Sequence, residues 1–396
     1  MGAVNKHLDH AEDLILLKGS EGAREAIAAL RTVGQTLSPS GGAAVTITTK
    51  WDGAPAVICG IDPADGKFFV GTKGVFAQTP KLAKTQSDVQ RLYSGALAAK
   101  LSLCLRYLPQ VVTSGVLQGD LLYTNDKSSE SIDGKSYITF RPNTLTYAVE
   151  PNSKIGREIQ SSSLGIVFHT RYTGDSIQTM QASFGVTDNE YQKTGEVWAT
   201  SATFTNVGGV ATLSPDEYRI FTSAVNQAEG SAKQASRFLD QIQSGKKKLQ
   251  FDTIFLQFFN SYYKKGSQIP GVSITYNAFV RYLAEKYNEE ISKNKTLDTQ
   301  AKKAFQFVDA IDSIMANSRG MQMLIATYLN ITRAKMILVN KLNQVEQMRV
   351  FVADGQGYRV TNQEGFVAIP SGKGAVKLID RLEFSMLNFT VPKNWG

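Results

Sequence analysis

The chain has very few of the residues that build metal centres and disulfides. It contains two cysteines, Cys59 and Cys104, and three histidines among 396 residues. Both cysteines lie in apolar stretches, where a buried free thiol is the expected state. A structural zinc site gathers four Cys or His ligands, so this composition argues against one. Free thiols also suit a reducing compartment, and we expect the protein in the cytoplasm.

Long apolar runs are missing as well. No stretch approaches the roughly 18 apolar residues that a membrane helix needs, and no basic segment followed by an apolar one marks a secretory signal. The sequence also lacks internal repeats and low-complexity tracts. We therefore expect no membrane partner and no repeat architecture.

What is present is an ordinary globular composition with an excess of positive charge. Hydrophobic residues make up 42% of the chain and charged residues 20%, as in folded globular domains. The formal net charge is +8 and the pI about 9.2. A basic chain favours an anionic partner, and nucleic acid is the first candidate.

The hydrophobic pattern divides the chain into four segments. The first and third show helical spacing and the second and fourth mostly strand-like alternation, with bounds at 1–38, 43–212, 213–345 and 346–396. The third segment has 18 Lys and Arg against 11 Asp and Glu, so nearly all of the net charge belongs to it. This order predicts an α+β fold, in which 1–212 and 346–396 form one core and 213–345 is a basic helical insertion.

One tetrapeptide stands out at a strand end. Lys50-Trp51-Asp52-Gly53 follows an alternating run and precedes another apolar one. A neutral lysine amine attacks phosphorus or carbonyl centres, nearby cations or a bound metal lower its pKa, and a glycine lets a nucleotide approach the backbone closely. Taken alone, the tetrapeptide favours a solvated hairpin turn, because so short a motif occurs by chance.

The tetrapeptide resembles motif I of the covalent nucleotidyltransferases, which comprise the ATP-dependent DNA and RNA ligases and the mRNA capping enzymes. In that superfamily the motif I lysine becomes covalently linked to a nucleoside monophosphate. The resemblance implies an antiparallel-sheet nucleotidyltransferase core, the ligase adenylation fold, in which Lys50 is catalytic. It also implies that Asp52 and Gly53 contact the nucleotide.

Later motifs of the superfamily have counterparts in the same order along the chain. In the run 69–74, Lys73 stands where a nucleotide-contacting arginine is usual. In 115–121, Asp120 takes the place of the motif III glutamate that binds the ribose. In 164–169, Phe168 resembles the motif IIIa aromatic residue that stacks on the base. Glu364 in 364–367 matches the metal-binding glutamate of motif IV, and Lys377 in 375–378 matches the motif V lysine that contacts the α-phosphate.

Three features depart from the ligase pattern. Pro55 stands where an arginine is usual, and Lys377 lacks the second lysine of motif V, for which Lys373 is a substitute. The chain ends at Gly396, so we expect no OB domain to carry motif VI. Adenylylation would then rely on the N-terminal or inserted helices, or be lost.

A narrower resemblance covers most of the chain. The runs 7–10, 50–76 and 376–381 are similar to an uncharacterised, ligase-like family of large tailed phages. Membership would place the protein in the cytoplasm of a bacterial host.

These expectations combine into one main hypothesis and two alternatives. The main one is an ATP- and Mg²⁺-dependent polynucleotide ligase or adenylyltransferase acting on 5′-phosphate ends, with RNA favoured over DNA because RNA ligases more often lack the OB domain. The alternatives are a GTP-using capping enzyme and a catalytically inactive nucleic-acid-binding or virion-associated protein. Basic clusters of the insertion are the expected strand contacts, although such runs are often only a solvated face; they comprise Lys246, Lys247, Lys248, Lys264 and Lys265.

Overall fold

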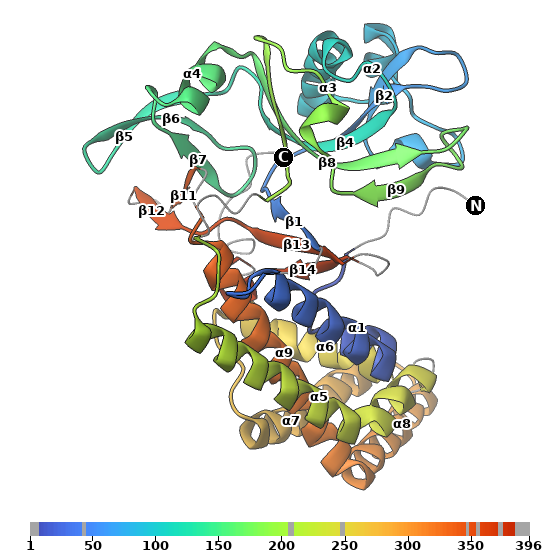
Figure 1. The fold of residues 1–396 in the computed structure, drawn as a ribbon. Helices are drawn as coiled ribbons and strands as arrows, with labels where there is room; N and C mark the ends of the chain where they lie inside the picture. The colour runs from blue at the N-terminus through green and yellow to red at the C-terminus, as the bar shows by residue number, and fades with distance from the viewer. Residues whose placement is uncertain are drawn as a thin grey trace.

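Three β-sheets lie on one side of the molecule and a helical region lies on the other (Figure 1). The expected α+β class is confirmed. The structure is a computed structural model, and it describes residues 8–41, 45–204, 210–245, 250–345, 348–353, 357–370 and 375–384.

The smallest sheet joins the two ends of the chain. It is antiparallel in the order β1-β13-β14, so a strand from near residue 50 pairs with strands beyond residue 360. Successive side chains of a strand point to opposite faces of the sheet. On one face, Ile47, Phe366 and Leu378 are buried against the helical region. The strands are β1 (Val45–Lys50), β13 (Gly365–Pro370) and β14 (Val376–Leu378).

The largest sheet is mixed and is covered by helices α2 and α3. Its order is β10-β8-β4-β2-β3, with β9 paired to β8; β10 runs parallel to β8 and the other pairs are antiparallel. The strands are β2 (Ala56–Ile61), β3 (Phe68–Gly71), β4 (Val116–Tyr123), β8 (Leu164–Thr173), β9 (Gln181–Phe184) and β10 (Val197–Ser201); the helices are α2 (Gln86–Leu92) and α3 (Gly95–Tyr107).

A third, antiparallel sheet has the order β12-β11-β7-β6-β5. It again pairs the middle of the chain with its end, since β7 lies beside β11. Its strands are β5 (Ser128–Ile132), β6 (Lys135–Phe140), β7 (Thr146–Val149), β11 (Arg349–Ala353) and β12 (Tyr358–Thr361), and helix α4 (Lys154–Ser161) follows β7. Three short 3-10 turns lie elsewhere, between elements of the large sheet and its helices: η1 (Lys73–Phe76), η2 (Leu108–Gln110) and η3 (Asp188–Glu190).

The helical region combines the N-terminal helix with the expected insertion. Helix α5 starts where Ser214 and Glu217 form a capping box, which satisfies free backbone N–H groups. Helix α1 packs with α5 and α9 in one hydrophobic cluster, which also contains the buried side chains of β1, β13 and β14. The helices are α1 (Leu14–Thr36), α5 (Pro215–Ser244), α6 (Phe251–Lys264), α7 (Val272–Lys293), α8 (Leu297–Ala316) and α9 (Ser318–Leu342).

Among the described residues, none of the helices has both the length and the apolar character to cross a membrane.

Candidate functional site

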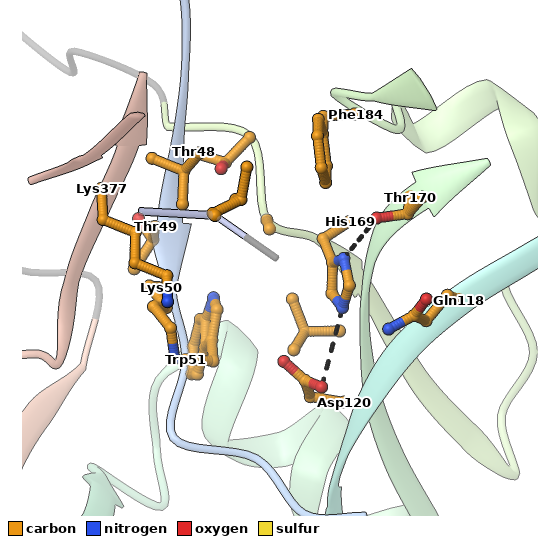
Figure 2. Close-up of a pocket in the computed structure, with 14 residues that line it drawn as sticks. Thr48, Thr49, Lys50, Trp51, Gln118, Asp120, His169, Thr170, Phe184 and Lys377 are labelled. Carbon is orange, nitrogen blue, oxygen red and sulfur yellow. Dashed lines mark hydrogen bonds and ion pairs between the residues drawn. The ribbon is translucent and has the colours of Figure 1, made fainter. Parts of the chain in front are cut away.

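A pocket lies between the small sheet and the large one, with Lys50 in its wall (Figure 2). On the small sheet, Thr48, Val367 and Lys377 pair in one row across β1, β13 and β14. All three line the pocket. Most of their neighbours, Ile47, Phe366, Ala368, Val376 and Leu378, are buried in the helical core instead, whereas Thr49 also lines the pocket. The period-two alternation of these strands therefore places Lys377, and Lys50 two residues after Thr48, on the pocket side.

The opposite wall comes from β4, β8 and β9. Asp120 pairs with Val167, and both line the pocket. The register then shifts: Gln118 pairs with Thr170 and Gly119 with Phe168, which leaves His169 without an opposite residue. Such a β-bulge redirects side chains and occurs often beside active sites.

His169 faces the pocket by alternation with Val167, and the bulge adds Thr170 beside it. The Nε2 of His169 lies 3.6 Å from the Oδ1 of Asp120, and its Nδ1 is 2.7 Å from the hydroxyl of Thr170 (Figure 2). Polar groups from β4 and β8 thus converge opposite Lys50 and Lys377.

Lys50 forms an ion pair with Glu364, the residue that precedes β13. The two meet because Lys50 pairs with Gly365 in the β1–β13 ladder. Gly365 has a φ of +147°, and a Cβ there would lie 2.6 Å from the carbonyl oxygen of Leu378. Only glycine suits this position, so the turn that presents Glu364 depends on it. The Lys50 side chain retains 30% exposure, which leaves it accessible from the pocket.

The electrostatics of this pair follow from burial and proximity. Burial lowers the pKa of Lys50, but the charge and hydrogen bond of Glu364, with smaller contributions from Asp120 and Asp52, raise it above its ordinary value. This is the opposite of the lowering expected from neighbouring cations. Burial raises the pKa of Glu364 to about 7, although the charge of Lys50 opposes the rise. The carboxylate of Glu364 is therefore a stronger proton acceptor than that of an exposed glutamate.

Lys377 lies on the same wall as Lys50 (Figure 2). Burial, and then the positive charge of Lys50, lower the pKa of Lys377. Its backbone N–H donates a hydrogen bond to the carbonyl oxygen of Asp9, 3.1 Å away. The segment before α1 therefore lies along the outer edge of β14. Lys50 and Lys377 line the same pocket, and their positive charges suit it to an anion.

Asp52 and Gly53 lie outside the pocket and fix the chain that follows Lys50. Asp52 is buried and accepts hydrogen bonds of 2.7 Å from the side chain of Asn143 and from the backbone N–H groups of Thr144 and Leu145. A Cβ on Gly53 would lie 2.5 Å from the Cβ of Asp120. The close approach that this glycine permits is thus to β4, and neither residue lines the pocket.

The remaining expected residues do not line the pocket. Phe168 is fully buried on the opposite face of β8, against Tyr191, because it alternates with Val167 and His169. Lys73 begins η1 and is exposed. Lys264 and Lys265 are exposed at the end of α6. Lys246, Lys247, Lys248 and Lys373 lie outside the described residues.

The pocket contains an aromatic residue that the motif comparison did not select. Phe184, at the end of β9, faces the pocket across from Lys50, and Trp51 lies below that lysine (Figure 2). Trp51 is held by Tyr147, with ring centroids 5.0 Å apart. No motif marks Phe184; its position depends on β9 pairing with β8.

The carboxylates at the pocket suit a metal ion that is bound partly by a substrate. Within the described ranges there is no group of three or more His, Cys, Asp and Glu side chains that is able to hold a metal. Glu364 and Asp120 both lie near enough to affect the pKa of Lys50. Mg²⁺ typically binds through one or two carboxylates together with substrate phosphates and water. The residues therefore fit Mg²⁺ that arrives with a nucleotide, and do not fit a resident ion.

Comparison with known proteins gives a family but no function. A family of unknown function, DUF6267, matches residues 5–393, which is nearly the whole chain. The chain belongs to this family. No curated protein and no solved structure matches this chain.

Proposed function

We propose that this member of DUF6267 is a covalent nucleotidyltransferase, an ATP-dependent polynucleotide ligase or adenylyltransferase that acts through Lys50. One observation carries the proposal: Lys50, Asp120 and Lys377, which lie far apart in sequence, line one pocket between two sheets, and Glu364 forms an ion pair with Lys50. These are the counterparts of motifs I, III, IV and V. Chance matches to short motifs would not be expected to converge in space.

The pocket supports a defined role for each wall. The carboxylate of Asp120 would accept hydrogen bonds from ribose hydroxyls, and Phe184, with Trp51, would supply the aromatic contact to the base that the resemblance assigned to Phe168. Lys377 would lie against the phosphates, where a fixed positive charge stabilises charge that develops on the phosphoryl oxygens.

The chemical step would begin with loss of a proton from Lys50, because an ammonium has no lone pair. Glu364 is in contact with Lys50, and its pKa of about 7 suits it to accept that proton. The Lys50 Nζ would attack the α-phosphorus of ATP, forming a P–N bond as the bond to the bridging oxygen breaks and pyrophosphate leaves. Mg²⁺ bound with ATP would neutralise charge on the phosphates.

The adenylate would then pass to the 5′-phosphate of a strand, with RNA favoured over DNA. The excess positive charge of residues 213–345 supports a strand bound along the helical region, since phosphate contacts with lysines dominate such binding. Lys264 and Lys265 are exposed at the end of α6, and Lys246, Lys247 and Lys248 precede the same helix in sequence.

A second candidate is a nucleic-acid-binding or virion-associated protein that performs no transfer. The observation that favours it is the raised pKa of Lys50, which keeps the amine protonated in its pair with Glu364. Such a protein would bind nucleotide or nucleic acid without forming a covalent bond.

Labelled nucleotides distinguish the two candidates. The protein is incubated with Mg²⁺ and ATP or GTP labelled at the α-phosphate, and the products are separated on a denaturing gel. A band with ATP that disappears in Lys50→Ala, and persists in the exposed-lysine control Lys67→Ala, supports the proposal. A band with GTP alone indicates the capping reaction, and no band with either nucleotide favours the binding protein.

A further inference from the structure

Helix α8 exposes large apolar side chains along its length. Nine large hydrophobic side chains are exposed among the described residues, and four of them belong to this one helix. Contiguous exposed apolar surface of this kind marks an interaction site more often than scattered single residues do. The exposed fractions are 83% for Leu297, 74% for Phe305, 52% for Val308 and 61% for Met315.

The spacing of this surface is that of a helix–helix contact. Ala301, Phe305, Val308, Asp312 and Met315 are all exposed and follow one another at intervals of four and three. This is the seam of a heptad repeat, which packs against another helix. The opposite face of α8 is already used, because Ala310 and Ile314 are fully buried in the helical core.

The start of α7 extends the same surface. The Tyr276 hydroxyl lies 3.9 Å from the sulfur of Met315, so the beginning of α7 is beside the end of α8. Ile274, in the first turn of α7 and two residues before Tyr276, is 61% exposed. We call Ile274, Phe305, Val308 and Met315 the α8 surface.

We propose that the α8 surface binds a second copy of this chain, with the two α8 helices antiparallel about a two-fold axis. In that arrangement Phe305 of each copy packs on Val308 of the other. Exposed Lys302 then lies near Asp309 and Asp312 of the second copy, twice by symmetry. A parallel arrangement would place Lys302 against Lys302 and Asp312 against Asp312, so the charges select the antiparallel one.

The proposal is independent of the nucleotidyltransferase activity. The helical region covers the face of β13 and β14 that points away from the pocket (Figure 1). Self-association through α8 therefore leaves the pocket open, and variants of the α8 surface keep their nucleotide chemistry.

Sedimentation velocity over a range of concentrations tests the association. The wild-type protein is expected to reach twice its mass of 43.3 kDa, and Phe305→Glu to weaken the association by about 30-fold or more, as for a buried aromatic anchor. Val360→Glu is the matched control, because Val360 is 60% exposed but lies on β12. A wild-type protein that stays monomeric, or a dimer that Phe305→Glu leaves intact, overturns the proposal.

Charge reversal and cross-linking test the orientation. Lys302→Glu and Asp312→Lys should each weaken the dimer, and the double variant should restore it. Both native cysteines are buried, so introduced thiols report cleanly: a mixture of Phe305→Cys and Val308→Cys proteins should form mixed disulfides faster than either protein alone. Faster cross-linking of Phe305→Cys to itself contradicts the antiparallel arrangement.

Discussion

Replacing Lys335 by methionine should destabilise the protein strongly, although this lysine does not line the pocket. Lys335, on α9, is 1% exposed, and its Nζ lies 2.6 Å from the Oε1 of Glu12, which is fully buried. Arg381, which follows β14, is 3.6 Å from the same oxygen and 2.9 Å from Asp13. This buried network joins α1 and α9 to the strand that carries Lys377.

The size of the effect follows from burial. Removing one partner of a buried ion pair leaves an uncompensated charge, at a cost of about 3–5 kcal/mol. Arg381 still offsets part of the charge of Glu12, so we expect about 3 kcal/mol. Total stabilities are typically about 5–15 kcal/mol, and with a urea m-value of about 3 kcal/mol per M the midpoint should fall by roughly 1 M.

Urea unfolding followed by circular dichroism measures this difference. The matched control is Lys303→Met, whose Nζ lies 2.8 Å from Glu290 in a pair that is 34% and 39% exposed; it should cost no more than about 1 kcal/mol. Glu12→Gln should recover part of the loss in the Lys335→Met background. Equal effects of Lys335→Met and Lys303→Met would refute the argument from burial.

The pH dependence of the same variant has a definite sign. Burial raises the pKa of Glu12, but Lys335 and Arg381 lower it more, to about 2 against an ordinary 4.5. A depressed carboxyl pKa contributes stability that is complete above 4.5 and is lost as the pH falls toward 2. The difference in unfolding free energy between the wild type and Lys335→Met should therefore shrink over that range.

Three further outcomes follow from the pocket. Phe184→Ala should weaken ATP binding by about 10-fold in calorimetry, as the loss of one aromatic contact to a base, whereas Phe168→Ala should lower the free energy of unfolding by about 3–5 kcal/mol. Gly53→Ala should cost about 1–3 kcal/mol in urea unfolding, because its Cβ would press on Asp120. Formation of the covalent adduct should accelerate as the pH rises above 7, because the raised pKa of Lys50 keeps most of the amine protonated at neutral pH; a rate that is independent of pH would contradict this.

Some features of this fold could be predicted from the sequence because they are local. The helix start at Ser214 follows from capping chemistry, and the alternating run before Lys50 from strand periodicity. The helical character of 213–345 also followed from its spacing. In contrast, the packing of α1 on α5 and α9 could not be predicted, since an amphipathic pattern identifies a buried face but not its partner.

The site was predictable to a similar extent. Motif order selected Lys50, Asp120 and Lys377, which line the pocket. It also selected Phe168, which the strand alternation turns into the core. Alternation places His169 on the same side as Val167, but Thr170 reaches the pocket through a bulge, and bulges depend on the pairing of two distant strands. Contacts that depend on strand register therefore needed the structure.

Peptide mass spectrometry shows directly whether Lys50 becomes covalently joined to a nucleotide. The protein is incubated with ATP and Mg²⁺, digested under conditions that preserve the P–N bond, and searched for peptides that carry an added AMP. The account predicts AMP on the peptide that contains Lys50 and no adduct in Lys50→Ala. AMP on Lys377 or another lysine, or no adduct while the folded protein binds ATP, would contradict it.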